Sequence, residues 1–164
     1  MVSVSKLYEF SEKEWENFFI LFRECDEEIF HKSIFEGSWS PENILRHLLG
    51  SLVIINNAAL LTEKIETKLT FWFTENPEEK ITIDQIEEEY HRLNEIVKKG
   101  MAEITPVKEN ELITFNKREM PRIDFLIMLF NHEHSHFGQL LWILKRETNW
   151  TTGDVFKKID EKKK

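Results

Sequence analysis

The positions of apolar residues along the chain predict long helices. Apolar and aromatic side chains recur at intervals of three and four residues, the spacing that places them on one face of an α-helix. Four segments show this pattern, at residues 11–31, 40–64, 82–104 and 121–147. At 1.5 Å per residue, helices of roughly 20–27 residues extend about 30–40 Å. The pattern therefore predicts an all-α fold, a four-helix bundle.

Three of the four segments begin with residues that favour a helix start. Ser11 opens a capping-box pattern, with Glu14 three residues later, and Thr82 opens a similar one. Ser40 precedes Pro41, whose fixed φ suits the first helical position. The first helix is accordingly expected to begin at Ser11 and to continue to about His31.

The remaining segments predict shorter elements. Residues 67–80 read as a loop with an aromatic anchor, and residues 107–119 as an extended connector or a short hairpin. A short tail helix is expected from Asp154. The stretch from Ile123 to Phe130 is apolar nearly all round, so the last long helix is expected to be the most buried.

Composition narrows the class of protein. The 164 residues are 41% apolar and are expected to form one domain, 1–164. The net charge of −8 disfavours nucleic acid as a partner. The single cysteine, Cys25, lies among acidic residues that should keep its thiol unreactive. Because neither a signal peptide nor a long apolar run is evident, a cytoplasmic protein without membrane contact is expected.

Two histidines carry the first chemical signal. His132 and His136 are one helical turn apart, on an apolar stripe that includes Leu129 and Leu140. Two buried imidazoles in an apolar seam need partners for their nitrogens, and a divalent metal ion provides one. Hydrogen bonds to carbonyls or polar side chains are the alternative, which we consider weaker for a pair with this spacing.

His47 is the candidate for a third ligand. It lies on the inward stripe of the second long helix, with Ile44 and Leu48. The alternative is a core histidine whose ring nitrogens make ordinary hydrogen bonds and bind no metal. Together with His132 and His136 it would form a three-histidine site with an open coordination position, the pattern of catalytic metal sites. The sequence places His31, His91 and His134 outside this group.

The same run also contains the H-E-x-x-H pattern of zinc peptidases. In that interpretation His132 and His136 bind zinc and Glu133 is the general base. The extended peptidase pattern fails, because Gln139 and Trp142 occupy the positions of its glycine and third histidine. The short pattern fixes only three residues, so this interpretation is the weakest.

Two stretches of the chain resemble the DinB/YfiT-like family of metal-binding four-helix bundles. The stretch 39–48, WSPENILRHL, is similar to the start of that family's second helix, and 131–140, NHEHSHFGQL, to the H-x-x-x-H-x-G-Q signature of its last long helix. The resemblance implies a bundle with a long crossover connection. It also implies zinc or nickel bound by His47, His132 and His136, and a homodimer.

The family resemblance also suggests a chemistry. It implies a metal-dependent hydrolase or a thiol S-transferase that acts on a small-molecule substrate with bacillithiol or glutathione. Glu133 would then be a catalytic base or metal-flanking acceptor, or else a surface residue. Gln139 is placed to orient a ligand, and Asn43 to line the pocket mouth. Trp39 is expected in the core or at a dimer contact, as are the aromatic residues of the loop, Phe71, Trp72 and Phe73.

A non-catalytic bundle is the alternative from a different class. Such a protein would bind metal, or act in a stress response, with a three-histidine site that is structural or vestigial. Bound metal alone does not separate the two hypotheses, because both predict it.

Overall fold

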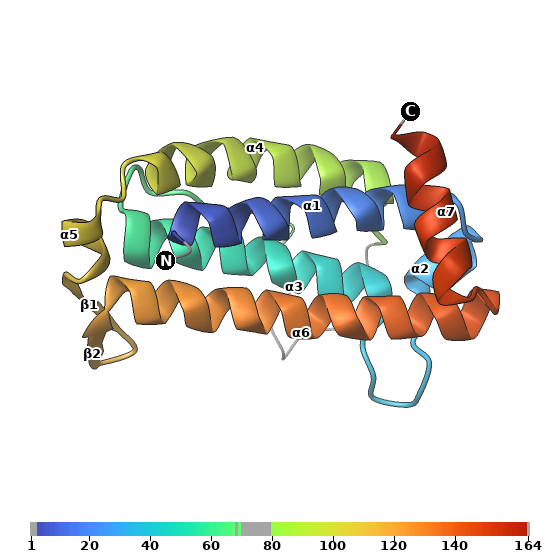
Figure 1. Cartoon of the computed structure of the whole chain (residues 1–164). Helices are drawn as coiled ribbons and strands as arrows, with labels where there is room; N and C mark the ends of the chain where they lie inside the picture. Colours follow the sequence, from blue (N-terminus) through green and yellow to red (C-terminus); the bar gives the residue numbers. More distant parts are fainter. Residues whose placement is uncertain (1–2, 68, 70–79, 164) are drawn as a thin grey trace.

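The computed structural model describes residues 3–67, 69 and 80–163, and four long helices dominate this part of the chain (Figure 1). Helices α1 and α3 each lie beside both α4 and α6, which encloses a single core. This arrangement confirms the predicted all-α bundle. The long helices are α1 (Val4–Arg23), α3 (Pro41–Ile54), which continues as the π-helix η1 (Ile55–Leu60), α4 (Ile83–Ala102) and α6 (Arg122–Thr148). The short elements are α2 (Glu27–His31), α5 (Pro106–Glu109), the antiparallel strands β1 (Leu112–Phe115) and β2 (Arg118–Pro121), and α7 (Thr152–Lys162).

The helices follow an up-down-down-up order. In Figure 1, α1 and α6 run in one direction and α3 and α4 in the other. Because η1 ends at one end of the bundle and α4 begins at the other, the connection between them crosses the length of the bundle, as expected. Its first part is fixed by Asn57, whose side chain donates to the Ile65 carbonyl and accepts from the Ile65 amide. The side chain of Asn56 donates to the Glu63 carbonyl and accepts from the Thr62 hydroxyl.

The predicted start of the first helix is wrong. Helix α1 begins at Val4, and its cap is Ser3, whose hydroxyl accepts from the Lys6 amide. Ser11 is buried in the middle of the helix, where its hydroxyl faces the core. The helix also ends earlier than predicted, at Arg23, and Asp26 caps the separate helix α2. An S-x-x-E pattern thus occurred inside a helix, where it caps nothing.

Most other boundaries agree with the sequence. Ser40 caps α3, and Thr82 and Gln85 form a reciprocal capping box at the start of α4. A short hairpin, one of the two forms expected for 107–119, is present, and its second strand continues to Pro121. The tail helix is present and begins at Thr152. The aromatic residues of the loop, Phe71, Trp72 and Phe73, lie outside the described residues.

The core is rich in large aromatic side chains. Trp15 and Phe19 from α1 and Tyr90 from α4 are fully buried, and the rings of Trp15 and Tyr90 stack with centroids 4.6 Å apart. The first half of α6 is buried on one side only, because Ile127 and Met128 are 37% and 44% exposed. The expectation that the last long helix is the most buried is wrong, because 11 of the 14 residues of α3 are buried but only 9 of the 27 residues of α6. Within the described residues, every helix is too short or too polar to cross a lipid bilayer.

Candidate metal centre

The three predicted histidines meet in the interior of the bundle. His47 comes from α3, and His132 and His136 come from successive turns of α6. The Nε2 atoms of His47 and His132 are 2.9 Å apart. Each of the three residues offers a ligand nitrogen, and the three nitrogens lie within 4.8 Å of one another. The fold thus brings together residues that are 85 positions apart in the chain.

This geometry fits a metal ion. Two imidazole nitrogens that face each other at 2.9 Å need a proton or a cation between them, because two lone pairs repel. Nitrogen ligands lie about 2.0–2.1 Å from zinc, so tetrahedral neighbours are about 3.4 Å apart. The observed cluster would need only small side-chain movements to reach that spacing. The group of His47, His132 and His136 could therefore hold a metal ion.

Burial favours the neutral, metal-binding form of two of these imidazoles, those of His132 and His136. His47 is 5% exposed, and the other two rings are partly buried. Burial lowers the pKa of His132, and the positive charge that His136 can carry lowers it further. Burial also lowers the pKa of His136, against the opposing effect of the hydrogen bond that its ring donates to Gln139. Neutral imidazole is the ligand form, so metal binding needs little proton release near pH 7.

Gln139 fixes the orientation of one predicted ligand. Nδ1 of His136 and Oε1 of Gln139 are 2.8 Å apart, so the ring N–H donates a hydrogen bond to the amide oxygen. That tautomer leaves Nε2 of His136 unprotonated and free to coordinate. Partners of this kind set the ring position of metal-binding histidines. Gln139, expected to orient a ligand, thus contacts one of the three histidines.

Trp39 is a site residue that the sequence argument missed. It lies just before α3, and its ring centroid is 5.0 Å from that of His47 and 6.0 Å from that of His136. The planes of Trp39 and His136 differ by only 16°, so the two rings stack. Trp39 also packs against the hydrophobic core, one of the two places expected for it. Its place eight residues before His47, within the stretch that resembles the family, was the available signal.

Glu133 lies on another side of α6. Its side chain is fully buried, and Oε2 accepts a hydrogen bond of 2.7 Å from the Ser11 hydroxyl of α1. The interpretation of Glu133 as a surface residue is therefore wrong. Burial raises its pKa to about 7, although the bond from Ser11 acts in the opposite direction. The carboxyl contacts α1, whereas His132 contacts His47 on α3. A catalytic role for Glu133 gains no support from these contacts and stays a prediction.

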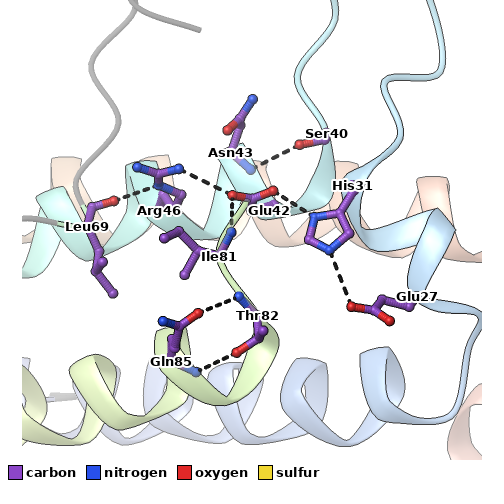
Figure 2. A network of polar contacts seen from close by, with 10 residues as sticks. All are labelled: Glu27, His31, Ser40, Glu42, Asn43, Arg46, Leu69, Ile81, Thr82 and Gln85. Carbon is purple, nitrogen blue, oxygen red and sulfur yellow. Dashed lines mark hydrogen bonds and ion pairs between the residues drawn. The ribbon is translucent and has the colours of Figure 1, made fainter. Parts of the chain in front are cut away.

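The start of α3, which carries His47, is held by a buried polar network (Figure 2). Oε1 of Glu42 accepts bonds from Arg46 Nη1 at 3.2 Å and from the Ile81 amide at 3.0 Å. Oε2 of Glu42 lies 2.8 Å from Nδ1 of His31. Arg46 also donates to the Leu69 carbonyl. One carboxylate thus joins α2, α3 and the segment before α4, and so fixes the helix that presents His47.

The remaining candidates lie away from the three histidines. His134 is exposed, and its Nδ1 is 2.8 Å from the carbonyl of Phe130 in its own helix. His91 is exposed on α4, as expected. Burial raises the pKa of the Cys25 thiol to about 11, which agrees with an unreactive cysteine. Asn43 is partly buried at the start of α3, where its backbone amide donates to the hydroxyl of the cap residue Ser40.

A cavity of about 360 Å³ opens beside the histidines. His136 and Gln139 form part of its wall, together with Trp39 and Trp142. Asn43, expected at the pocket mouth, is not one of the described residues that line it. The cavity gives a small molecule access to one of the candidate metal ligands.

Comparison with known proteins agrees with this architecture. The family model described as "DinB family" matches residues 1–148. None of the curated proteins compared with the chain is similar enough to count as a relative. A solved structure of a DinB-like protein from Bacillus cereus ATCC 10987 shares the fold, with a TM-score of 0.69 and 22% sequence identity. That similarity covers 92% of this chain and 95% of the other. The chain therefore belongs to the DinB family.

Proposed function

We propose that the protein is a metal-dependent enzyme that acts on a small electrophilic molecule, as a hydrolase or as a thiol S-transferase. The observation that carries the proposal is the convergence of His47, His132 and His136 next to an open cavity. Three neutral ligands leave a divalent ion with its full charge and at least one free coordination position. Zinc and nickel are the ions proposed.

The metal ion would supply Lewis acidity, which lowers the pKa of a water molecule or of a thiol such as bacillithiol or glutathione. The side chains of the protein would supply position. His47, His132 and His136 would hold the ion, and Gln139, which accepts from Nδ1 of His136, would leave Nε2 of that ring available to bind it. Trp39 covers one side of the His47 and His136 rings, which shields that side from bulk water.

The reaction in its transferase form is a substitution. The thiol sulfur bonds the electrophilic carbon of the substrate, the bond from that carbon to the leaving group breaks, and the thiol proton passes to solvent. In the hydrolase form water takes the place of the thiol. A peptidase is less well supported, because Glu133 contacts Ser11 on α1 and not the side of α6 that carries the histidines.

Turnover with and without metal tests this proposal. The protein, loaded with zinc or nickel, is assayed with bacillithiol or glutathione against chloro- and epoxide-bearing electrophiles, and with water against esters and amides. We expect turnover on at least one substrate, which disappears on chelation and in the variant His132→Ala. If metal binds but no substrate in the panel is turned over, the non-catalytic alternative replaces the enzyme.

A homodimer is also part of the proposal. Exposed apolar side chains on α6 and in the hairpin would be covered in a dimer, and Met128 and Leu112 are 44% and 65% exposed. Light scattering on the protein as it elutes from a size-exclusion column gives the mass of the particle in solution. We expect twice the mass of one chain, and a monomer at micromolar concentration would contradict this part.

A further inference from the structure

The cavity beside His136 is walled mainly by aromatic and aliphatic side chains. One wall is the loop between α2 and α3, and the other is the second half of α6. Among the described residues that line the cavity, none carries a permanent charge. Its volume of about 360 Å³ is near the lower end of the range for small-molecule sites, roughly 300–1,000 Å³. The side chains that matter here are Phe35, Trp39, His136, Gln139, Trp142 and Ile143.

Two aromatic rings of the cavity wall are about half exposed to solvent. Phe35 and Trp142 are 53% and 50% exposed, and their ring centroids are 6.0 Å apart. The guanidinium of Arg146 lies over both rings, 4.8 Å from the centre of Phe35 and 5.3 Å from that of Trp142. This cation–π contact holds the loop against α6. Two large rings therefore present their remaining surface to the cavity and to solvent.

The loop that carries Phe35 is ordered by its own hydrogen bonds. The Ser38 hydroxyl donates to the Phe35 carbonyl at 2.9 Å and accepts from the Phe35 amide at 3.0 Å. Gly37 has a φ of +78°, in the left-handed region that a glycine adopts without strain. The wall is thus formed in advance, which reduces the entropy lost when a ligand binds.

The inner end of the cavity reaches the histidine cluster. Trp39 stacks on the His136 ring and also lines the cavity, so one indole belongs to both. The oxygen of Gln139 bonds His136, which leaves its NH₂ group as a donor for a ligand. A ligand in this space would contact flat π-faces, aliphatic groups and one amide donor.

We propose that this cavity binds a flat aromatic group of the substrate, one or two fused rings in size and without charge. This inference rests on the proposed function, whose substrate it specifies. Ring faces prefer other rings in offset or edge contacts, which favours an aromatic over a saturated group of the same shape. A polar substituent on the ring would accept from Gln139 and lie beside His136.

Binding of 2-naphthol to the metal-free protein tests the inference. With ¹⁵N-labelled indoles, addition of 2-naphthol should shift the side-chain NH signals of Trp39 and Trp142 and leave that of Trp150 unchanged. The saturated analogue 2-decalol should bind at least fivefold more weakly. Equal affinity for the two compounds, or shifts that spare Trp142, would overturn the inference.

Two substitutions at exposed aromatic residues provide a matched pair. Trp142→Ala removes one wall of the cavity and should weaken binding of 2-naphthol at least fivefold, with Phe35→Ala as a second variant of the same kind. Phe156→Ala removes a ring that is 62% exposed on α7, away from this cavity, and should leave the affinity unchanged. If the Trp142 and Phe156 variants behave alike, the inference is wrong.

Nickel loading separates this inference from the proposed function. In the nickel-loaded protein the paramagnetic ion should broaden the signals of bound 2-naphthol, which places the ring near the histidines. Binding without broadening, in a protein shown to hold nickel, would overturn the inference but not the metal site. If the protein binds 2-naphthol at Trp142 but binds neither nickel nor zinc, the proposed function fails and the aromatic cavity stands.

Discussion

Adjacent residues of α6 place polar groups on two sides of the helix. The buried polar groups find different partners on the two sides. His132 and His136 face His47 on α3, next to a cavity that opens to solvent. Glu133 faces α1 in the closed core, where Ser11 is its hydrogen-bond partner. The first side gathers several ligand nitrogens, whereas the second holds a single acid.

The difference shows what each side requires to be stable. Three converging nitrogens are satisfied by a shared cation, which the open cavity can admit. A lone buried carboxyl has no such partner, and its Oε1 makes no hydrogen bond to the described residues. Its lower free-energy state is the protonated acid, which agrees with its raised pKa of about 7. The histidine side of α6 could therefore hold a metal ion, whereas the state of the Glu133 side depends on its proton.

The largest expected effect concerns the pH dependence of stability. Glu133 has a folded-state pKa of about 7, above the value near 4.5 for the free side chain, so the folded state binds more protons between these values. Stability attributable to this residue is therefore highest below pH 4.5 and falls as pH rises through 7. For the metal-free protein, the loss between pH 5 and pH 8 is about 2–3 kcal/mol.

The variant Glu133→Gln isolates that contribution. Gln keeps the shape of the side chain and does not ionise. In urea unfolding, the free energy of unfolding of Glu133→Gln should therefore rise relative to that of the parent as pH rises. The histidines titrate in both proteins, and their contribution cancels in the difference. A difference that is constant from pH 5 to pH 8 would show that Glu133 is ionised throughout and that the two sides of α6 are not distinct.

The second effect comes from the partner of Glu133. Ser11→Ala removes the one hydrogen bond that Oε2 of Glu133 makes with the described residues. It should lower the unfolding free energy by about 2 kcal/mol, the cost of a buried acceptor without a donor. Ser135→Ala is the matched control, because this serine is exposed and, among the described residues, its hydroxyl bonds only the Asn131 carbonyl of its own helix. Equal and small effects of the two variants would mean that the contact on α1 is unimportant.

The third effect belongs to the histidine side and is smaller. Gln139→Leu removes the acceptor for Nδ1 of His136 and should weaken zinc binding about tenfold, equivalent to about 1.4 kcal/mol. Gln139→Glu keeps an acceptor oxygen and should retain the parent affinity within threefold. A loss of affinity in both variants, measured by competition with a chelator, would argue against the orienting role.

The sequence predicted the long helices because their apolar spacing is set by burial in the core. The starts at Ser40 and Thr82 were predictable for a local reason, since a cap and its helix are adjacent in the chain. Ser11 was misread because the same S-x-x-E spacing also occurs within helices, and only the opposite helix shows where its hydroxyl points. The break after Arg23 and the π-helical end of α3 gave no comparable local signal.

The candidate site was predictable to the extent that it depends on helical periodicity. The spacing of His132 and His136 fixes their common side, and the apolar stripe around His47 indicates that it faces inward. The roles of Trp39 and Glu42 depend on which helices become neighbours. Their partners are distant in sequence, as in the bond between Glu42 and the Ile81 amide, so periodicity could not show them.

Metal content of two histidine variants tests the central claim most directly. The parent, His47→Ala and His134→Ala are purified alike, exposed to zinc, freed of excess ion and analysed for zinc per chain. We expect about one zinc for the parent and for His134→Ala, whose exposed ring lies outside the cluster, and almost none for His47→Ala. Stoichiometric zinc in a folded His47→Ala protein would contradict the three-histidine site.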